Sequence, residues 1–272
     1  MAAAGVVERV IGVDFAEAMV RHATQAASCR KIKNYKSMVA QIADLPFEEN
    51  SLDAVLARNV IGHLPSMKSG VKQMARVLTP GRRLVVSEWG PLERNPWAAV
   101  AVAAIREAGE WRLFKEDEPG PFRCSDPKTL ASLFKEADVQ KGYAISEVTG
   151  EVRFNSPEHY WRFLSEVFEP VASVLAGQLR ERHDAIRAAV IEAAKAHVHG
   201  NRPVFGWSAW VASGTKPRHR AQRPIRLHVQ YVDQDGHVWH EHESIYPEPK
   251  DAKPPFKSFA EILPRGRRLG VD

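Results

Sequence analysis

Val10-Ile-Gly-Val-Asp14 is the stretch that decides the fold, since it is mostly apolar and β-branched and ends on an acid. A short apolar run of this kind predicts a buried parallel strand. In the segment that follows, 16–30, Met19, Val20 and Ala23 recur at helical spacing, which predicts an amphipathic helix packed on a sheet. Open α/β sheets bind ligands at the carboxyl ends of their strands, so Asp14 is a candidate binding residue.

Strands and helices continue to alternate after this unit. The patterns predict a strand at 36–39, a turn at Asp44–Phe47, a strand at Leu52–Ala57, a helix at 67–77 closed by Thr79-Pro80-Gly81, and a strand at 83–88. This alternation predicts right-handed crossovers and a doubly wound, Rossmann-like, mostly parallel sheet.

The next part of the chain is richer in helices. We expect a helix at 96–113, a polar loop at 115–123, a helix that begins after Ser125 or Asp126, a strand at 143–153, helices at 157–168 and 171–198, and a strand at 204–213. The helical insertion, at about 156–198, lies between the last two strands. There it would form a lid over the mouth of the sheet for a small substrate.

Residues 1–216 therefore form one predicted domain, and 217–272 an extension. The extension opens with a basic run that contains no aromatic residue, which favours a solvated linker over a nucleic-acid surface. Alternating residues from Leu227 to Tyr231, followed by Asp235-Gly236, predict a hairpin, and the prolines of 247–255 predict an extended linker.

Composition limits the compartment and the class of protein. The chain has 272 residues, of which 44% are hydrophobic and 26% charged, a net charge of +5 and two cysteines, Cys29 and Cys124. These values are typical of a globular protein in a reducing compartment. The N-terminus lacks the pattern of a secretory leader, and the longest apolar run, 97–105, is too short to span a membrane. We expect a cytoplasmic protein that binds no nucleic acid.

Four stretches in this order and spacing resemble the ubiquinone/menaquinone-biosynthesis-like branch of class I methyltransferases that use S-adenosylmethionine (SAM). The matching stretches are Val10–Met19, Ala43–Val55, Ala57–Pro65 and Met74–Val86. The resemblance implies a sheet whose last strand is antiparallel, SAM as the cofactor, and in-line methyl transfer to a small molecule.

The same resemblance implies a cofactor site. Asp14 matches the acid that binds the ribose hydroxyls of SAM, and Phe15 follows it in the same site. Gln41 stands where the family usually has an aspartate that accepts a hydrogen bond from adenine, and its amide oxygen can accept that bond. Ile42 would pack on the adenine. Two alternatives stay open: an Asp14 that only favours the start of the helix, and an Ile42 that is simply a core residue.

The stretch after the strand Leu52–Ala57 supplies the remaining candidates. Arg58 and Asn59 match the wall on the methionine side of SAM, with a solvated arginine as the alternative. His63 would orient the acceptor or take its proton, with a structural histidine as the alternative. We expect no metal site, because the sequence offers no ligand set of suitable spacing.

The resemblance also identifies a missing feature. The family begins with a strand and a glycine-rich loop, for which nine residues before Val10 leave too little chain. We therefore expect a sheet that is incomplete at the N-terminus, with unpaired strand edges. The alternative function is a catalytically inactive methyltransferase-like remnant or binding protein.

Overall fold

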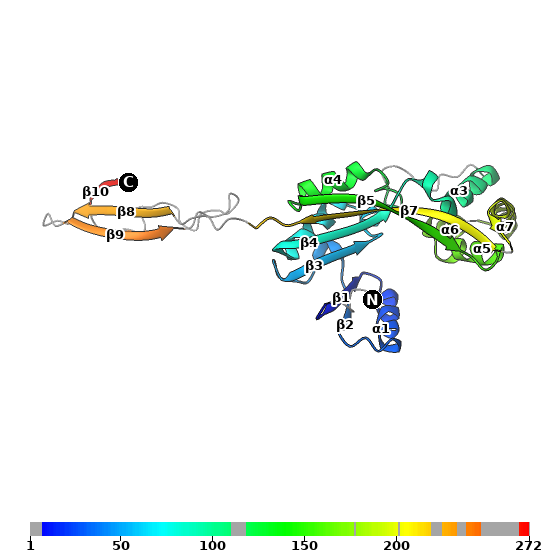
Figure 1. The fold of residues 1–272 in the computed structure, drawn as a ribbon, viewed down its shortest axis with the longest axis horizontal. Coiled ribbons are helices and arrows are strands. Elements are labelled where there is room, and N and C mark those ends of the chain that lie inside the picture. The colour runs from blue at the N-terminus through cyan, green and yellow to red at the C-terminus, as the bar shows by residue number, and fades with distance from the viewer. Residues whose placement is uncertain are drawn as a thin grey trace. The chain divides into compact units, whose positions relative to one another are not determined.

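The structure is a computed structural model that describes residues 7–109, 118–176, 178–200 and 202–218, and the backbone of 225–232, 238–245 and 267–271. Contacts divide the chain into two compact units, Met1–Pro217 and Arg218–Asp272. Figure 1 shows the strands and helices of both units.

The larger sheet of the first unit has the strand order β3-β4-β7-β5, with a short strand, β6, paired to β7. Its strands are β3 (Leu52–Arg58), β4 (Leu78–Trp89), β5 (Lys141–Arg153), β6 (Val198–His199) and β7 (Arg202–Thr215). β3 runs parallel to β4, whereas β7 is antiparallel to β4 and to β5. The prediction of a mostly parallel sheet with an antiparallel last strand is thus confirmed.

The opening stretch forms a second, smaller sheet in the same unit. β1 (Val10–Asp14) pairs in parallel with β2 (Tyr35–Val39), and α1 (Glu17–Cys29) connects them. Val13 and Ile42 pack against the main core, so this sheet is seated on the rest of the unit. In the described part of the chain, β1 pairs only with β2 and β3 only with β4, so each has one open edge.

The main core lies between the larger sheet and the helices α2 (Met67–Val77) and α4 (Pro127–Glu136). Two short 3-10 turns, η2 (Ile42–Asp44) and η3 (Ile61–His63), follow β2 and β3. The helices α2 and α4 each begin at a side-chain cap. Ser66 Oγ accepts from the Ser69 amide at the start of α2, and Asp126 Oδ1 accepts from the Lys128 amide at the start of α4. The fully buried residues of the main core include Val71, Leu78, Leu84, Val86, Leu130 and Phe134.

A second core joins the remaining helices to the first half of β7. They are η4 (Leu92–Arg94), α3 (Pro96–Gly109), α5 (Pro157–Glu166), α6 (Glu169–Ala176) and α7 (Arg180–Lys195), gathered at one end of the sheet in Figure 1. Trp97 lies at its centre, with ring centroids 5.1 Å from those of Trp89 and Phe168. The predicted insertion is therefore present, and the segment predicted as one helix over 171–198 is split between α6 and α7.

The start of β4 also differs from the sequence prediction, and some predictions lie outside the described residues. Residues 79–81 belong to β4, which begins at Leu78, directly after α2, where Leu78 pairs with Leu52. Gly81 has a φ of 85° within this strand. The end of the predicted helix at 110–113, residues 115–117 of the predicted loop and the proline-rich 247–255 are not described.

The second unit forms a three-stranded antiparallel sheet of order β10-β8-β9. Its strands are β8 (Ile225–Val232), β9 (Val238–Ile245) and β10 (Arg267–Val271). β8 and β9 are consecutive antiparallel strands.

Candidate functional site

Asp14 and Gln41 lie together at the carboxyl end of the β1–β2 pair. Asp14 stands opposite Val39 in the register, and the Ala40 amide donates to the Asp14 carbonyl oxygen at 3.0 Å. Gln41, the next residue, is exposed, whereas Asp14 is half-buried. A polar residue that ends β1 and another that follows β2 thus lie at the same end of this parallel pair.

Asp14 also contacts the start of α1. Its Oδ1 atom accepts a hydrogen bond from the Ala16 amide at 2.9 Å, and Ala16 itself supplies no side-chain cap. The helix-entry role considered from the sequence is therefore present. A carboxylate has two oxygens, so this bond occupies only part of its capacity.

The neighbours of these two residues differ in burial. Phe15 is 77% exposed, an unusual state for a large apolar side chain. Ile42, in contrast, is half-buried and packs against the main core. The core role of Ile42 is thus present in this structure, while Phe15 offers an apolar surface next to Asp14.

Arg58 and Asn59 lie at the carboxyl end of β3, beside β4. Arg58 is exposed and stands opposite Ser87, and the Asn59 amide donates to the Ser87 carbonyl oxygen at 2.7 Å. Asn59 has a φ of 51°, in the left-handed region that asparagine adopts more readily than most residues. Backbone conformation alone therefore favours an asparagine here, whatever else its side chain binds.

His63 closes the turn η3 and is exposed. The protein around its ring still lowers the pKa of His63 from its ordinary 6.5, and the negative charge of Glu169 opposes that shift. The ring is thus neutral at neutral pH and can accept a proton. Glu169 begins α6, so the first turn of a helix of the insertion lies within electrostatic reach of the candidate catalytic residue.

Glu88 is an acidic residue that sequence reasoning did not select. It ends the apolar stretch of β4 and is fully buried. Its Oε1 atom accepts from the amides of Val60 and Ile61 at 2.9 and 2.7 Å, in the loop that carries His63. Burial raises the pKa of Glu88 to about 7, although backbone amides oppose the rise. The signal was available in the sequence, because Glu88 ends the predicted strand 83–88 much as Asp14 ends its own predicted strand.

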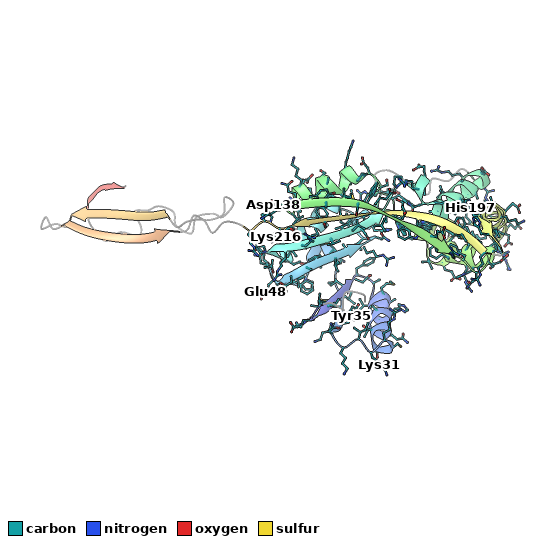
Figure 2. All side chains as sticks on the ribbon, in the orientation of Figure 1. Lys31, Tyr35, Glu48, Asp138, His197 and Lys216 are labelled. Atoms are coloured by element: carbon teal, nitrogen blue, oxygen red, sulfur yellow. The ribbon has the colours of Figure 1, made fainter. Side chains whose placement is uncertain are left out.

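An open surface hollow of about 340 Å³ lies elsewhere, at the other end of the sheet. Its lining includes Lys216, which directly follows the residue paired with Arg83 at the amino side of β4. Figure 2 labels Lys216 and Asp138, two of its lining residues. Lining side chains of both charges, and bonds from Lys216 Nζ to the Ala75 and Arg76 carbonyl oxygens, give this hollow a structural explanation.

The described residues form neither a metal site nor a membrane span. No group of three or more histidine, cysteine, aspartate or glutamate side chains is arranged to hold a metal ion there. None of the described helices has the length and apolar character needed to cross a membrane.

The first 86 residues match the family described as methyltransferase domain. The demethylmenaquinone methyltransferase of Staphylococcus epidermidis is 29% identical over 143 residues, which cover 47% of this chain and 56% of that protein. YafE of Escherichia coli is 29% identical over 115 residues, or 41% of this chain and 55% of YafE. The chain spans about half the length of these two curated relatives.

Solved structures agree at the level of the fold. YcgJ of Bacillus subtilis superposes with a TM-score of 0.50 at 18% identity, covering 80% of this chain and 86% of YcgJ. The BH2331 protein of Bacillus halodurans gives 0.51 at 16% identity, covering 80% and 87%. The match over residues 1–86 and the Rossmann-like sheet agree with each other: residues 1–86 are similar to a methyltransferase domain, and the fold resembles that of these two solved structures.

Proposed function

We propose that this protein binds SAM and transfers its methyl group to a small molecule. The observation that carries the proposal is the position of Asp14 and Gln41 at the carboxyl end of the β1–β2 pair, inside the residues that match the methyltransferase domain. SAM is the cofactor of this family, and one relative is named for a small molecule, demethylmenaquinone. The comparisons give the alternative of an inactive remnant no support.

The chemistry of these residues fits the cofactor. Asp14 keeps one carboxylate oxygen beyond the Ala16 bond, and a carboxylate accepts strong hydrogen bonds from hydroxyl groups such as those of ribose. The amide of Gln41 can both accept and donate at an adenine edge. Phe15 adds exposed apolar surface, and Ile42 a half-buried one. These residues would hold the nucleoside part.

The loop after β3 would serve the reacting end. SAM supplies a methyl group that is already activated, so the protein's main task is to hold the acceptor in line with it. Arg58 and Asn59 would bind the amino-acid part of the cofactor. His63, neutral at neutral pH and exposed, would orient the acceptor or take its proton, with Glu169 nearby to stabilise the protonated ring.

Calorimetric titration of the full chain with SAM tests the cofactor site. We expect saturable binding that Asp14→Ala weakens by at least about tenfold, because that change removes a charge-assisted acceptor. The matched control is Asp53→Ala, an exposed β3 aspartate paired with Arg82, which should leave the affinity unchanged. Equal affinities for Asp14→Ala and the unmodified chain would contradict the assignment.

A further inference from the structure

Glu88 has a defined structural environment but no part yet in the proposed chemistry. It is fully buried, and Oε1 accepts from two consecutive amides, those of Val60 and Ile61. Its other oxygen, Oε2, is buried and has no hydrogen-bond partner among the described residues. Consecutive amides that converge on one oxygen form an anion-binding nest. Here the anion is a side chain of the protein itself.

The same loop is held from its other side. The Gly120 amide donates to the Gly62 carbonyl oxygen at 2.9 Å, and Arg123 Nη1 donates to the Leu64 carbonyl oxygen at 2.8 Å. A Cβ atom on Gly62 would lie 2.6 Å from the Gly120 carbonyl oxygen and 3.5 Å from Glu88 Oε2, so the approach is too close for a side chain. The loop therefore sits between the Glu88 carboxylate and the segment 120–123.

This loop carries three of the residues assigned to the site. Arg58 and Asn59 precede the two amides that Glu88 binds, and His63 follows them. Asn59 adopts a left-handed conformation, which costs energy unless neighbouring contacts maintain it. The Glu88 carboxylate provides such contacts directly after Asn59. Its bonds to amides are charge-assisted, and therefore stronger than those that a neutral acceptor would make.

We propose that Glu88 is a positioning residue, whose ionised carboxylate fixes the loop Asn59–His63 in the conformation that binds the cofactor. Neutralising Glu88 would loosen that loop and weaken SAM binding without removing any group that touches SAM. The effect on SAM binding, the second part of the proposal, rests on the proposed function. The first part, that Glu88 fixes the loop, concerns the protein alone.

The charge of Glu88 changes within the physiological range, which makes the proposal testable by pH. Because burial brings its pKa to about 7, Glu88 is largely neutral one unit below that value and largely ionised one unit above it. The charged and titratable neighbours are Arg123, Cys124 and, on the loop itself, His63. Arg123 stays charged, Cys124 has its pKa raised to about 12 by burial, and the pKa of His63 lies below 6.5.

Hydrogen exchange of the full chain without ligand tests the first part. At about pH 8, Glu88→Gln should speed exchange of the Val60 and Ile61 amides by about tenfold or more, because a neutral acceptor replaces a charged one. The matched control is Glu147→Gln, which alters a β5 carboxylate that accepts from Ser208 and pairs with Arg94 and should leave both amides unchanged. Equal exchange in Glu88→Gln and the unmodified chain would overturn the proposal.

A test without substitution covers the case of a variant that fails to fold. In the unmodified chain, protection of the same two amides, corrected for intrinsic exchange, should rise between about pH 6 and about pH 8 relative to that of the β4–β7 ladder, whose protection follows the global stability. Protection that does not change, or that changes equally in the ladder, would contradict a role for the charge.

SAM titrations at the same two pH values test the second part. The unmodified chain should bind SAM about tenfold more tightly at the higher pH, following the ionised fraction of Glu88, and Glu88→Gln should bind weakly at both. His63→Gln should keep the pH dependence. Tight binding that is independent of pH would contradict the positioning role. Absence of binding at both pH values would instead contradict the proposed function, while the exchange measurements would still decide the role of Glu88.

Discussion

Asp14 ends β1 and Glu88 is the last residue but one of β4, but Glu88 alone is fully buried. A half-buried carboxylate keeps access to a ligand, whereas a fully buried one acts on its own backbone neighbours. Sequence reasoning selected Asp14 through the family motif. The sequence did not show that Glu88 is buried and Asp14 is not, because the loop that covers Glu88 is far from it in the chain.

The raised pKa of Glu88 predicts how stability depends on pH. Since folding raises this pKa from 4.5 to about 7, folding favours the neutral form, and stability falls as pH rises through that window. The contribution is about 3 kcal/mol in total. Thermal or denaturant unfolding of Glu88→Gln should lose this part of the pH dependence. A variant with the same pH dependence as the unmodified chain would show that the carboxyl is not buried in solution.

Lys216 predicts a second effect on stability, separate from the site. Its Nζ donates to Asn50 Oδ1 and to the Ala75 and Arg76 carbonyl oxygens, at the end of α2. Lys216→Met keeps the apolar stem and removes these bonds, so we expect a loss of about 1–2 kcal/mol in denaturant unfolding. The control Lys195→Met, at an exposed pair with Glu192, should cost less than about 0.5 kcal/mol.

At the scale of elements, one hydroxyl ties the insertion to α3. Tyr160 of α5 is fully buried, and its Oη donates to the Trp97 carbonyl oxygen at 2.7 Å. Tyr160→Phe should destabilise the protein by about 1 kcal/mol, because the carbonyl loses its partner. Tyr143→Phe is a matched control, since the buried Tyr143 hydroxyl has no hydrogen-bond partner among the described residues and its removal should be neutral or stabilising. Denaturant unfolding of both variants checks the contrast.

The elements that the sequence predicted are those whose pattern is local. β1, α1, β3, α2 and α4 follow their apolar period and their caps, and Asp126 rather than Ser125 caps α4. The split between α6 and α7 was missed, because both helices are apolar on the face that packs on the second core. The extended conformation of 79–81 was missed too, since Pro80 and Gly81 are turn residues; they lie in an irregularity of the β3–β4 register, where the Gly81 amide donates to the Lys216 carbonyl oxygen.

At the scale of the whole molecule, the sequence identified the residues of the site more readily than their environment. Asp14 and Gln41 lie at the same end of the β1–β2 pair, because Asp14 stands opposite Val39 and Gln41 follows Val39 by two residues. The hydrogen bonds that hold the loop after β3 come from β4 and from the segment 120–123. No local sequence pattern connects these segments with the loop. Sites of this kind combine predictable strand ends with tertiary contacts that only the folded chain supplies.

Two sheets and two cores make up the first unit, and the candidate site draws on both sheets. The nucleoside residues lie at the end of β1–β2, and the loop of Arg58, Asn59 and His63 at the end of β3–β4. Val13 and Ile42 seat the smaller sheet on the main core. If both groups serve one cofactor, loss of either group should weaken its binding.

Calorimetric titration of the full chain with SAM, alongside Asp14→Ala and Arg58→Ala, is therefore the most direct test of the central claim. We predict one saturable site and a fall in affinity of about tenfold or more for each variant. Because the exposed Arg58 side chain supports little of the core, Arg58→Ala should keep the unfolding midpoint of the unmodified chain. Asp14→Ala also loses the bond to the Ala16 amide, so it should cost about 1 kcal/mol of stability. No heat of binding and no thermal shift with SAM at about millimolar concentration would contradict the claim that this chain is a SAM-binding methyltransferase.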